Sequence, residues 1–164
     1  MAESDLDAVA ALAVIAFPDH FEGRPCFANR LALYPAGCYV LARDREPVLG
    51  YLLAYPWLAD DAPALNILLD ALPAAPAVMY LHDLALHPNA RGAGHAATIV
   101  KHLAEVAEAA GWPVITLVAV NNAAAFWQRH GFQIRETHSL CQKLTSYGPD
   151  ARYMVRALPR AVIG

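Results

Sequence analysis

Two adjacent titratable side chains and a glycine-containing turn are the parts of this sequence best suited to chemistry. His82 and Asp83 lie within an apolar segment, and Arg91-Gly92-Ala93-Gly94 follows eight residues after that pair. A histidine exchanges protons near neutral pH, and a carboxylate can compete with it for that role. Two glycines let backbone amides approach a ligand closely, and Arg91 adds a charge that suits phosphate. The sequence therefore indicates a proton-transfer site beside an anion-binding turn.

The glycine turn joins two strongly patterned segments. Residues 78–86 favour a β-strand, and residues 95–110 favour a helix that ends at Gly111 and Pro113. A strand, turn and helix in this order direct free amides and the helix dipole at one point, which favours phosphate binding. An ordinary turn that needs glycine for its backbone angles is the alternative.

Two well-known classes of phosphate-binding loop are excluded. The Gly-Lys-Ser/Thr of a Walker loop is absent. The spacing Gly92-x-Gly94-x-x-Ala97 fits a dinucleotide-binding loop, but five residues, one of them proline, separate the preceding strand from Gly92. In addition, the next strand ends at Val120-Asn121, with no acidic residue to bind a ribose. Neither class is therefore expected here.

A third class fits better. The residues Arg91-Gly92-Ala93-Gly94-His95-Ala96 resemble motif A of the GCN5-related N-acetyltransferases, Arg/Gln-x-x-Gly-x-Gly/Ala. Asn121, followed by a helix that ends in Gly131-Phe132, is similar to the second motif of that family. Together the motifs cover residues 78–137. The resemblance implies one α/β domain over residues 1–164, with a mixed, mostly antiparallel twisted sheet flanked by helices, and an acetyl-CoA-binding half at about 78–137.

The resemblance also assigns the cofactor contacts. The pyrophosphate of coenzyme A would lie on the amides of residues 91–96, and the pantetheine arm would pair with the strand at 84–86. Two further residues would flank the cofactor across a gap between the strands at 78–86 and 114–120. The Leu86 N–H would polarise the thioester carbonyl. The expected cofactor-binding residues are Leu84, Ala85, Leu86, Arg91, Gly92, Ala93, Gly94, His95, Ala96, Asn121 and Phe126.

Acetyl transfer to an amine requires a group that takes up a proton. Residues 80–87 are similar to a strand of the arylalkylamine N-acetyltransferases, in which a histidine at the position of His82 helps to take up this proton. Alternation along a strand places Tyr80, His82 and Leu84 on one face and Asp83 on the other, and a bulge would exchange these faces. His82 and Asp83 are therefore rival candidates for the base.

At the group that protonates the leaving thiolate, this sequence departs from the family. Many members carry tyrosine four residues before the Gly-Phe pair, whereas this chain has Trp127, whose indole is no useful proton donor to sulfur. Water or Tyr147 would then supply the proton, although a tyrosine in a surface turn is the plain alternative for Tyr147. The departure also leaves a second hypothesis, a non-catalytic acetyl-CoA-binding sensor or scaffold.

The acceptor is expected to bind the first half of the chain, at the helices in 4–34 and the loop at 58–76. An aromatic wall for a small primary amine would come from Tyr55, Trp57 and Tyr80, unless these side chains belong to the core. A protein or peptide acceptor would need an open groove instead. No cysteine lies in a motif typical of a covalent acetyl-enzyme, so we expect direct transfer.

Composition excludes several other classes. The chain has 164 residues, 57% of them hydrophobic, but prolines and polar residues interrupt its most apolar stretch at 62–81, so no membrane span is expected. The net charge is −3 and the basic residues are scattered, which argues against nucleic acid. Three separated cysteines without metal-ligand spacing predict no metal site and favour the cytoplasm. Richness in alanine and arginine hints at a bacterial source.

The pattern predicts further elements around these motifs. Ser4 would cap a helix to residue 16, a second helix would span 22–34, and a turn at 44–47 would join two strands of a hairpin. The strand that begins the family's fold has almost no room before residue 4, so the sheet would lack it or a second copy would cover that edge in a homodimer. The other expected elements are strands at 38–43, 48–57, 114–120, 132–137 and 152–158, a helix at 123–130 and at most a short helix at 65–72.

Overall fold

The computed structural model describes residues 1–43 and 47–159. Its strands form one six-stranded sheet in the order β1-β2-β3-β4-β6-β5. Within the described residues β3 and β4 pair in parallel and every other neighbouring pair is antiparallel. The strands are β1 (Cys38–Leu41), β2 (Gly50–Trp57), β3 (Val78–Leu86), β4 (Val114–Ala119), β5 (Gln133–Ile134) and β6 (Arg152–Ala157). The expected single α/β domain with a mixed, mostly antiparallel sheet is confirmed.

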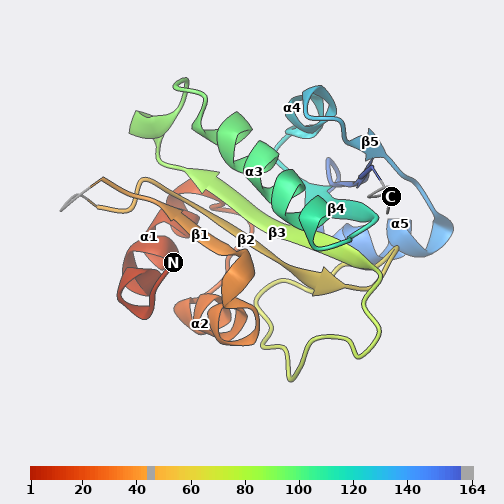
Figure 1. Ribbon diagram of the computed structural model, residues 1–164, viewed down its shortest axis with the longest axis horizontal. Helices are drawn as coiled ribbons and strands as arrows, with labels where there is room; N and C mark the ends of the chain where they lie inside the picture. Colours follow the sequence, from red (N-terminus) through yellow and green to blue (C-terminus); the bar gives the residue numbers. More distant parts are fainter. Residues whose placement is uncertain (44–46, 160–164) are drawn as a thin grey trace.

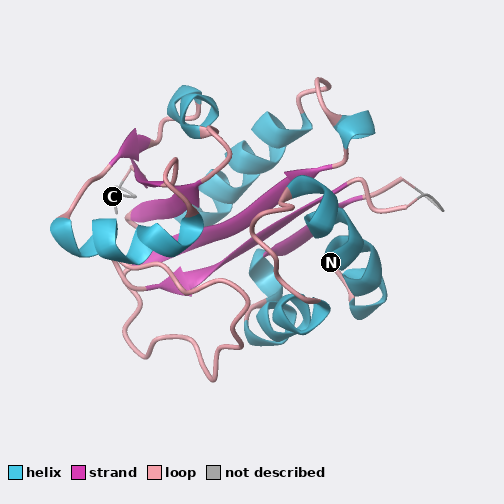
Figure 2. Cartoon of the chain, turned by 180° about the vertical axis from the view of Figure 1, so that it is seen from behind, coloured by secondary structure: helices cyan, strands magenta, loops and turns pink. Residues whose placement is uncertain are grey.

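Helices cover both faces of this sheet. One face carries α3 (His95–Ala109) and α4 (Ala124–Arg129), and α3 lies in front of the strands in Figure 1. The other face carries α1 (Leu6–Ala16), α2 (Arg24–Leu33) and α5 (His138–Leu144); α1 and α5 lie in front of the strands in Figure 2. Successive apolar side chains of β2 pack on opposite faces of the sheet: Leu52 packs under α3, whereas Leu53 packs under α1.

Several expected elements change at their ends. Residues Glu3–Asp5 form a short 3-10 helix and α1 starts at Leu6, so the side chain of Ser4 does not cap it. The strand expected at 132–137 shrinks to β5, and the unpredicted helix α5 follows, where the Thr137 side chain accepts a hydrogen bond from the Leu140 amide. No helix forms at 65–72, because that part of the 58–77 loop is held by side chains of α2 instead. The predicted turn at 44–47 lies largely outside the described residues.

The edge of the sheet at β1 has no strand beside it within residues 1–43. Residues 1–5 contain no strand, and the terminal amine of Met1 donates a hydrogen bond to the Cys38 carbonyl at 3.1 Å. The homodimer suggested by this edge stays a prediction. In the described part of the chain, no helix combines the length and the apolar character that a membrane crossing requires.

A β-bulge in β3 controls which side chains share a face. Leu53 pairs with Asp83 and the next residue of β2, Ala54, pairs with Leu81, so His82 is an extra residue in β3. The bulge corrects the simple alternation expected from the sequence. Asp83 lies on the α1 and α2 side together with His82, and Leu84 packs on the α3 side.

The parallel pair β3–β4 is short. Met79–Leu81 pair with Ile115–Leu117, and no pairing follows although both strands continue. The two strands therefore separate directly after the bulge, between the helices of the two faces. This separation, together with the bulge, places both kinds of predicted site residue around one opening in the sheet.

Candidate active site

A cavity of about 670 Å³ lies at the separation of β3 and β4. Its wall includes β3 from Leu81 to Leu86 and the residues at the end of β4. The glycine turn and the start of α3 line one end. Residues between α1 and α2 and Tyr147 line the other end. One cavity thus connects the predicted anion-binding turn with the predicted proton-transfer residues.

The glycine turn presents free backbone amides. Gly92 and Gly94 have φ of +81° and +80°, and a Cβ built on either would meet no atom within 4 Å. Gly94 precedes α3 and no side chain caps this helix, so the amides of His95 and Ala96 at its start have no side-chain acceptor. The turn therefore offers an uncapped helix N-terminus and open space, which fit a pyrophosphate.

Strand β3 presents backbone groups to the same cavity. The His87 amide donates to the carbonyl of Leu49, the residue before β2, at 2.8 Å. Because hydrogen-bonding positions alternate along an antiparallel pair, the amides of Leu84 and Leu86 point away from β2 and toward the opening. These groups are free to pair with an extended ligand, as a pantetheine arm requires.

The far wall of the opening comes from the end of β4 and from α4. Asn121 has a φ of +54°, and both Asn121 and Phe126 line the cavity. The Phe126 ring packs edge-on against Trp127, with ring centroids 5.0 Å apart. Trp127, which takes the position of the tyrosine that many members of the resembling family carry, also lines the cavity. Of the predicted cofactor-binding residues, Ala93 alone does not line the cavity.

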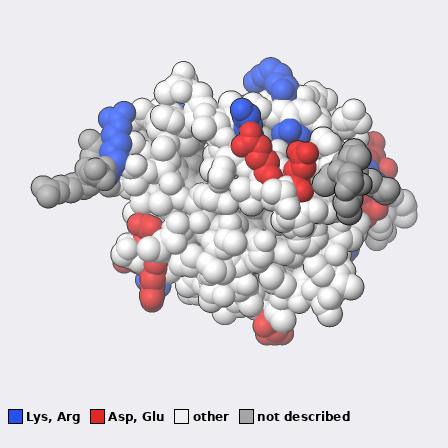
Figure 3. Space-filling view, in the orientation of Figure 1, with Lys and Arg blue, Asp and Glu red and all other residues white. Residues whose placement is uncertain are grey.

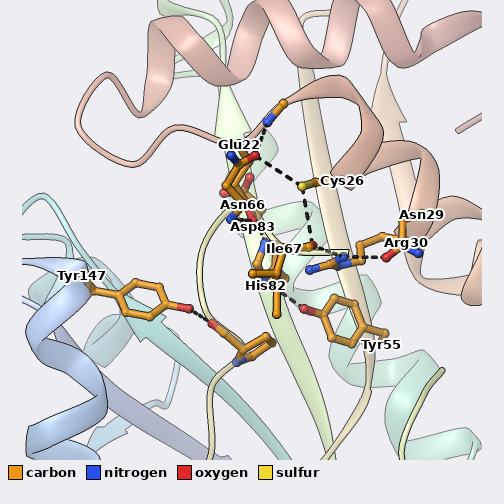
Figure 4. A network of polar contacts seen from close by, with 12 residues as sticks. Glu22, Cys26, Asn29, Arg30, Tyr55, Asn66, Ile67, His82, Asp83 and Tyr147 are labelled. Atoms are coloured by element: carbon orange, nitrogen blue, oxygen red, sulfur yellow. Dashed lines mark hydrogen bonds and ion pairs between the residues drawn. The ribbon is translucent and has the colours of Figure 1, made fainter. Parts of the chain in front are cut away.

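His82 and Asp83 both line the cavity, but His82 is already fully bonded. Its Nε2 lies 2.6 Å from Oε2 of Glu22, and its Nδ1 lies 3.1 Å from the Tyr55 hydroxyl (Figure 4). Only 3% of the His82 side chain and 6% of the Glu22 side chain are exposed. Burial alone would raise the pKa of Glu22, but His82, together with the Asn66 amide and the charge of Arg30, outweighs it and lowers that pKa. The pair is a buried, mutually satisfied unit.

Asp83 has a different environment. It is half-buried and accepts a hydrogen bond from the Tyr51 hydroxyl at 2.6 Å. Burial raises the pKa of Asp83 to about 7, although nearby His82 and the Tyr51 hydrogen bond oppose the shift. Asp83 is therefore poised between acid and carboxylate near neutral pH.

Tyr147 is buried, which excludes the surface-turn alternative. It ends a 3-10 helix (Thr145–Tyr147), lines the cavity, and donates its hydroxyl to the Pro63 carbonyl (Figure 4). Burial raises the pKa of Tyr147 to about 12, so the phenol stays protonated at neutral pH. The backbone carbonyl of Tyr147 lies 2.6 Å from Nε2 of His20.

The three predicted acceptor contacts cluster, but away from the cavity wall. Tyr55 lies 5.7 Å from Tyr80 and 5.8 Å from Trp57 between ring centroids. Both tyrosines are 1% exposed and pack with Leu69 under the 58–77 loop. None of the three lines the cavity. Tyr55 instead acts on the site through its hydrogen bond to His82.

Glu22 and His20 are site residues that no sequence motif indicates. Both lie between α1 and α2, and both line the cavity. Glu22 lies 60 positions from His82 in sequence, and the segment around it matches no motif. Only the three-dimensional fold joins it to β3, so no local sequence signal could have found it.

The 58–77 loop contacts Glu22 and Tyr147 and is anchored at both sides. Toward α2, Asn29 both donates to and accepts from the backbone of Leu69, at 3.0 Å each. Closer to the site, the Asn66 amide donates to Oε1 of Glu22 at 3.1 Å. Toward the C-terminal half, Lys143 pairs with Asp61 and Tyr147 donates to Pro63. Figure 2 shows that this long connection has no regular structure.

Charge on the molecular surface is sparse. Figure 3 shows small separate groups of acidic and basic side chains on this face and no extended basic area. Among the described residues, no group of three histidine, cysteine or acidic side chains is placed to hold a metal ion. Opposite charges also pair locally, as in Arg24 with Asp7 at 2.5 Å.

Comparisons with solved structures show the shared fold. Ard1 from Thermoplasma volcanium is 14% identical with a TM-score of 0.73, over 98% of this chain and 95% of that chain. The ribosomal-protein-S18-alanine N-acetyltransferase from Escherichia coli is 16% identical with a TM-score of 0.66, over 100% and 94%. The GphF GNAT-like decarboxylase in complex with isobutyryl-CoA is 17% identical with a TM-score of 0.73, over 97% of each. No curated protein matches the chain.

A family model decides the assignment. The model for the acetyltransferase (GNAT) family matches residues 6–132, well over half of the chain. The acyl donor of this family is acetyl-CoA, and the cavity fits it: open glycines and free amides suit the pyrophosphate, and the free edge of β3 suits the pantetheine arm. The match also spans the segment that contributes Glu22 and His20 to the site. The chain therefore belongs to the acetyltransferase (GNAT) family.

Proposed function

We propose that this protein is an N-acetyltransferase that moves the acetyl group of acetyl-CoA to a primary amine of a small molecule by direct transfer. The continuity of the cavity carries the proposal. One end, the donor end, consists of backbone amides of the glycine turn and the start of α3. The other end, the acceptor end, contains Glu22, Asp83 and His20, so an acyl donor and an amine would meet beside β3. A cytoplasmic location and a homodimer remain predictions from the sequence.

The donor end would hold coenzyme A through the chain's own amides. Amides at the start of α3 would bind the pyrophosphate, with Arg91 beside them. The bound donor supplies an activated acetyl group as a thioester. The Leu86 N–H, directed into the opening, would polarise the carbonyl of that group and stabilise negative charge on its oxygen.

The acceptor end suits a cation. Asp83 and Glu22 are carboxyl groups, and Arg91, the one basic Lys or Arg side chain that lines the cavity among the described residues, belongs to the donor end. An ammonium would therefore be attracted past the 58–77 loop to the carboxylate of Asp83. The Oδ1 atom of this carboxylate makes no hydrogen bond within the described residues. In this proposal Asp83 holds the acceptor, and His82 keeps Glu22 in place rather than meeting the amine.

Tyr147 would supply the proton for the departing thiolate. Tyr147 is one of the residues that line the cavity and its phenol is protonated, and rotation away from Pro63 would direct its hydroxyl to sulfur. None of the three cysteines lines the cavity, which favours direct transfer over a covalent acetyl-cysteine. Trp127 then serves as a wall of the donor site.

The anchored 58–77 loop favours a small acceptor. Hydrogen bonds and an ion pair tie it to α2 and to the C-terminal half, so it narrows the approach to Asp83. The E. coli S18-alanine enzyme, by its name, acetylates a protein. A free peptide N-terminus is therefore the competing acceptor, and the experiment below includes it.

Thiol release tests the proposal. The full chain is mixed with acetyl-CoA and either a panel of small primary amines or short peptides with a free N-terminus. Release that requires an amine from the small-molecule panel supports the proposal. Release with peptides alone replaces it by a peptide acetyltransferase, and tight acetyl-CoA binding in calorimetry without release for any acceptor replaces it by a sensor or scaffold.

A further inference from the structure

His82 and His20 both lie at the acceptor end, and they differ in whether a ring nitrogen is left without a hydrogen-bond partner. A carboxylate can only accept, so Nε2 of His82 donates to Glu22. In the neutral ring Nδ1 then accepts from the Tyr55 hydroxyl, and in the charged ring Nδ1 donates to it. Neutral His82 therefore has no lone pair left for an acceptor. Taking a proton from an amine would require it to lose its bond with Tyr55.

His20 has the opposite balance. Its Nε2 lies 2.6 Å from the Tyr147 carbonyl, and a carbonyl oxygen can only accept, so Nε2 carries the hydrogen. The neutral ring then holds a lone pair on Nδ1. This atom is buried and has no hydrogen-bond partner within the described residues, although the residue lines the cavity. A buried polar atom without a partner, in a residue that lines a cavity, points to a ligand that supplies one.

We propose that Nδ1 of His20 takes the proton from the acceptor ammonium. The inference rests on the proposed function and names the proton acceptor of that reaction. The Tyr147 carbonyl fixes the tautomer and the ring orientation, as the partner of a catalytic histidine does. Asp83 holds the ammonium, and His20 receives its proton.

The protons balance through the reaction. One N–H bond of the ammonium breaks, its electron pair stays on nitrogen, and the proton moves to Nδ1 of His20. The neutral nitrogen then forms a bond to the acetyl carbon while the carbon–sulfur bond breaks and sulfur leaves with that electron pair. Tyr147 gives its proton to sulfur and becomes a phenolate, and the second proton that nitrogen loses passes through solvent to that phenolate, which restores the phenol. His20 finally releases its proton to solvent.

Carboxylates around His20 would stabilise the imidazolium. They are Glu22 along the same segment, Asp83 from β3 and Asp150 from the turn before β6. The pKa of Asp150 is lowered mainly by a hydrogen bond from the Asn122 amide, and the charge of His20 contributes. The charge of His20 also opposes the burial that raises the pKa of Asp83, so both groups lie within electrostatic reach.

The first test needs no acceptor. Long-range ¹⁵N–¹H NMR of the full chain reports which ring nitrogen carries the hydrogen. We expect Nε2–H with a bare Nδ1 for His20. An Nδ1–H tautomer for neutral His20 would overturn the proposal whether or not the protein is an acetyltransferase.

The second test is kinetic and uses His20→Gln, because a glutamine amide can still donate to the Tyr147 carbonyl but has no basic lone pair. His138→Gln, at the exposed start of α5, is the matched control. With 2-phenylethylamine we expect His20→Gln to lower kcat by about 10²-fold or more, with KM changed by less than about threefold.

Amine basicity separates a base from a structural residue. With 2,2-difluoro-2-phenylethylamine, which is far less basic and already neutral, His20→Gln should lose less than about tenfold in kcat. Equal losses with both amines, or no loss with either, overturn the proposal. If the wild-type protein releases no thiol with any amine or peptide, the proposed function fails instead, and the NMR result still decides the state of His20.

Discussion

The donor end and the acceptor end of the cavity differ in the chemical groups that form them. The donor end consists mainly of backbone amides in residues that are close in sequence, from β3 through the glycine turn into α3. The acceptor end consists of side chains that distant segments bring together. Glu22 meets His82 across 60 positions, and Tyr147 meets Pro63 across 84.

This difference separates two kinds of specificity. Backbone amides at a helix start recognise the pyrophosphate of any coenzyme A derivative, whatever side chains surround them. The acceptor end instead depends on the charge, tautomer and hydrogen bonding of four or five side chains, so single substitutions can redirect it. We therefore expect donor-site variants to remove function as a whole and acceptor-site variants to change individual kinetic constants.

The largest effect is expected at the donor end, for Gly94→Glu. A side chain there would extend into the open space before α3, and its negative charge would repel the pyrophosphate. We expect acetyl-CoA affinity to fall by at least about 10³-fold, or about 4 kcal/mol, in calorimetry of the folded protein. Unchanged affinity would show that the turn is not the donor site.

Gly111→Glu is the matched control for this variant. Gly111 also has a φ of +80° and no atom within 4 Å of an added Cβ, but it follows the other end of α3. Both variants therefore place the same side chain at the same left-handed backbone angle. Only Gly94→Glu should lose the cofactor, and a similar loss in both would assign the effect to backbone strain.

The same contrast explains which parts of the fold the sequence could predict. The bounds of β3 and nearly all of α3 follow from apolar periodicity and from the stop at Gly111. In contrast, α5 has one buried residue, Leu140, so its helical period leaves almost no apolar pattern to detect. The bulge at His82 depends on the register with β2, which no local pattern contains.

The candidate site divides in the same way. Motif A and Asn121 indicate the donor end because a turn and a helix start are local structures. Glu22 and His20 carry no local signal, since their chemistry comes from contacts with β3 and with the Tyr147 carbonyl. Tyr55 was expected to contact the acceptor directly, but its hydroxyl is used by His82.

The second largest effect is expected on stability, for Glu22→Ala. This change leaves the buried His82 Nε2 and the Asn66 amide without their acceptor. At about 1–3 kcal/mol for each unsatisfied donor, we expect urea unfolding to show a loss of about 2–4 kcal/mol. Glu105→Ala, which removes an exposed pair with Lys101, should change stability by less than about 0.5 kcal/mol.

Measuring the stability difference between wild type and Glu22→Ala at several pH values tests whether the charge of Glu22 causes it. The pKa of Glu22 is lowered in the folded protein, so its carboxylate stabilises the fold above the ordinary value of 4.5 and loses that effect as the pH falls through the lower folded value. The difference between wild type and Glu22→Ala should therefore shrink on acidification. A difference that is constant from neutral pH into the acid range would contradict a charged role for Glu22.

A smaller effect is expected on turnover, for Tyr147→Phe. Removing the hydroxyl deletes the proposed proton donor to sulfur, and we expect kcat to fall by about 10²-fold with little change in the KM for acetyl-CoA. An acyl donor with a more acidic thiol than coenzyme A needs less help in leaving and should reduce the loss. Full activity of the variant would assign thiolate protonation to water.

The smallest effect is expected for Asp83→Asn, which keeps a hydrogen-bond acceptor for Tyr51 and removes the charge that holds the ammonium. We expect the KM for a basic amine to rise by about tenfold while kcat changes less, which is the opposite of the pattern for His20→Gln. In wild type the carboxylate forms as the pH rises through about 7, so amine affinity should increase over that range. The variant should lose this dependence.

The pH dependence of stability gives an independent measure of the protonation of the Asp83 carboxyl group. Its pKa is about 7 in the folded protein and near its ordinary value of 3.8 in the unfolded chain. Between these values the folded state holds a proton that the unfolded state has released, so this group makes stability fall as the pH rises from about 4 to about 7. Asp83→Asn should remove that slope, and Glu22→Ala should not. If both variants keep the slope, Asp83 is not the group that links proton uptake to the acceptor end.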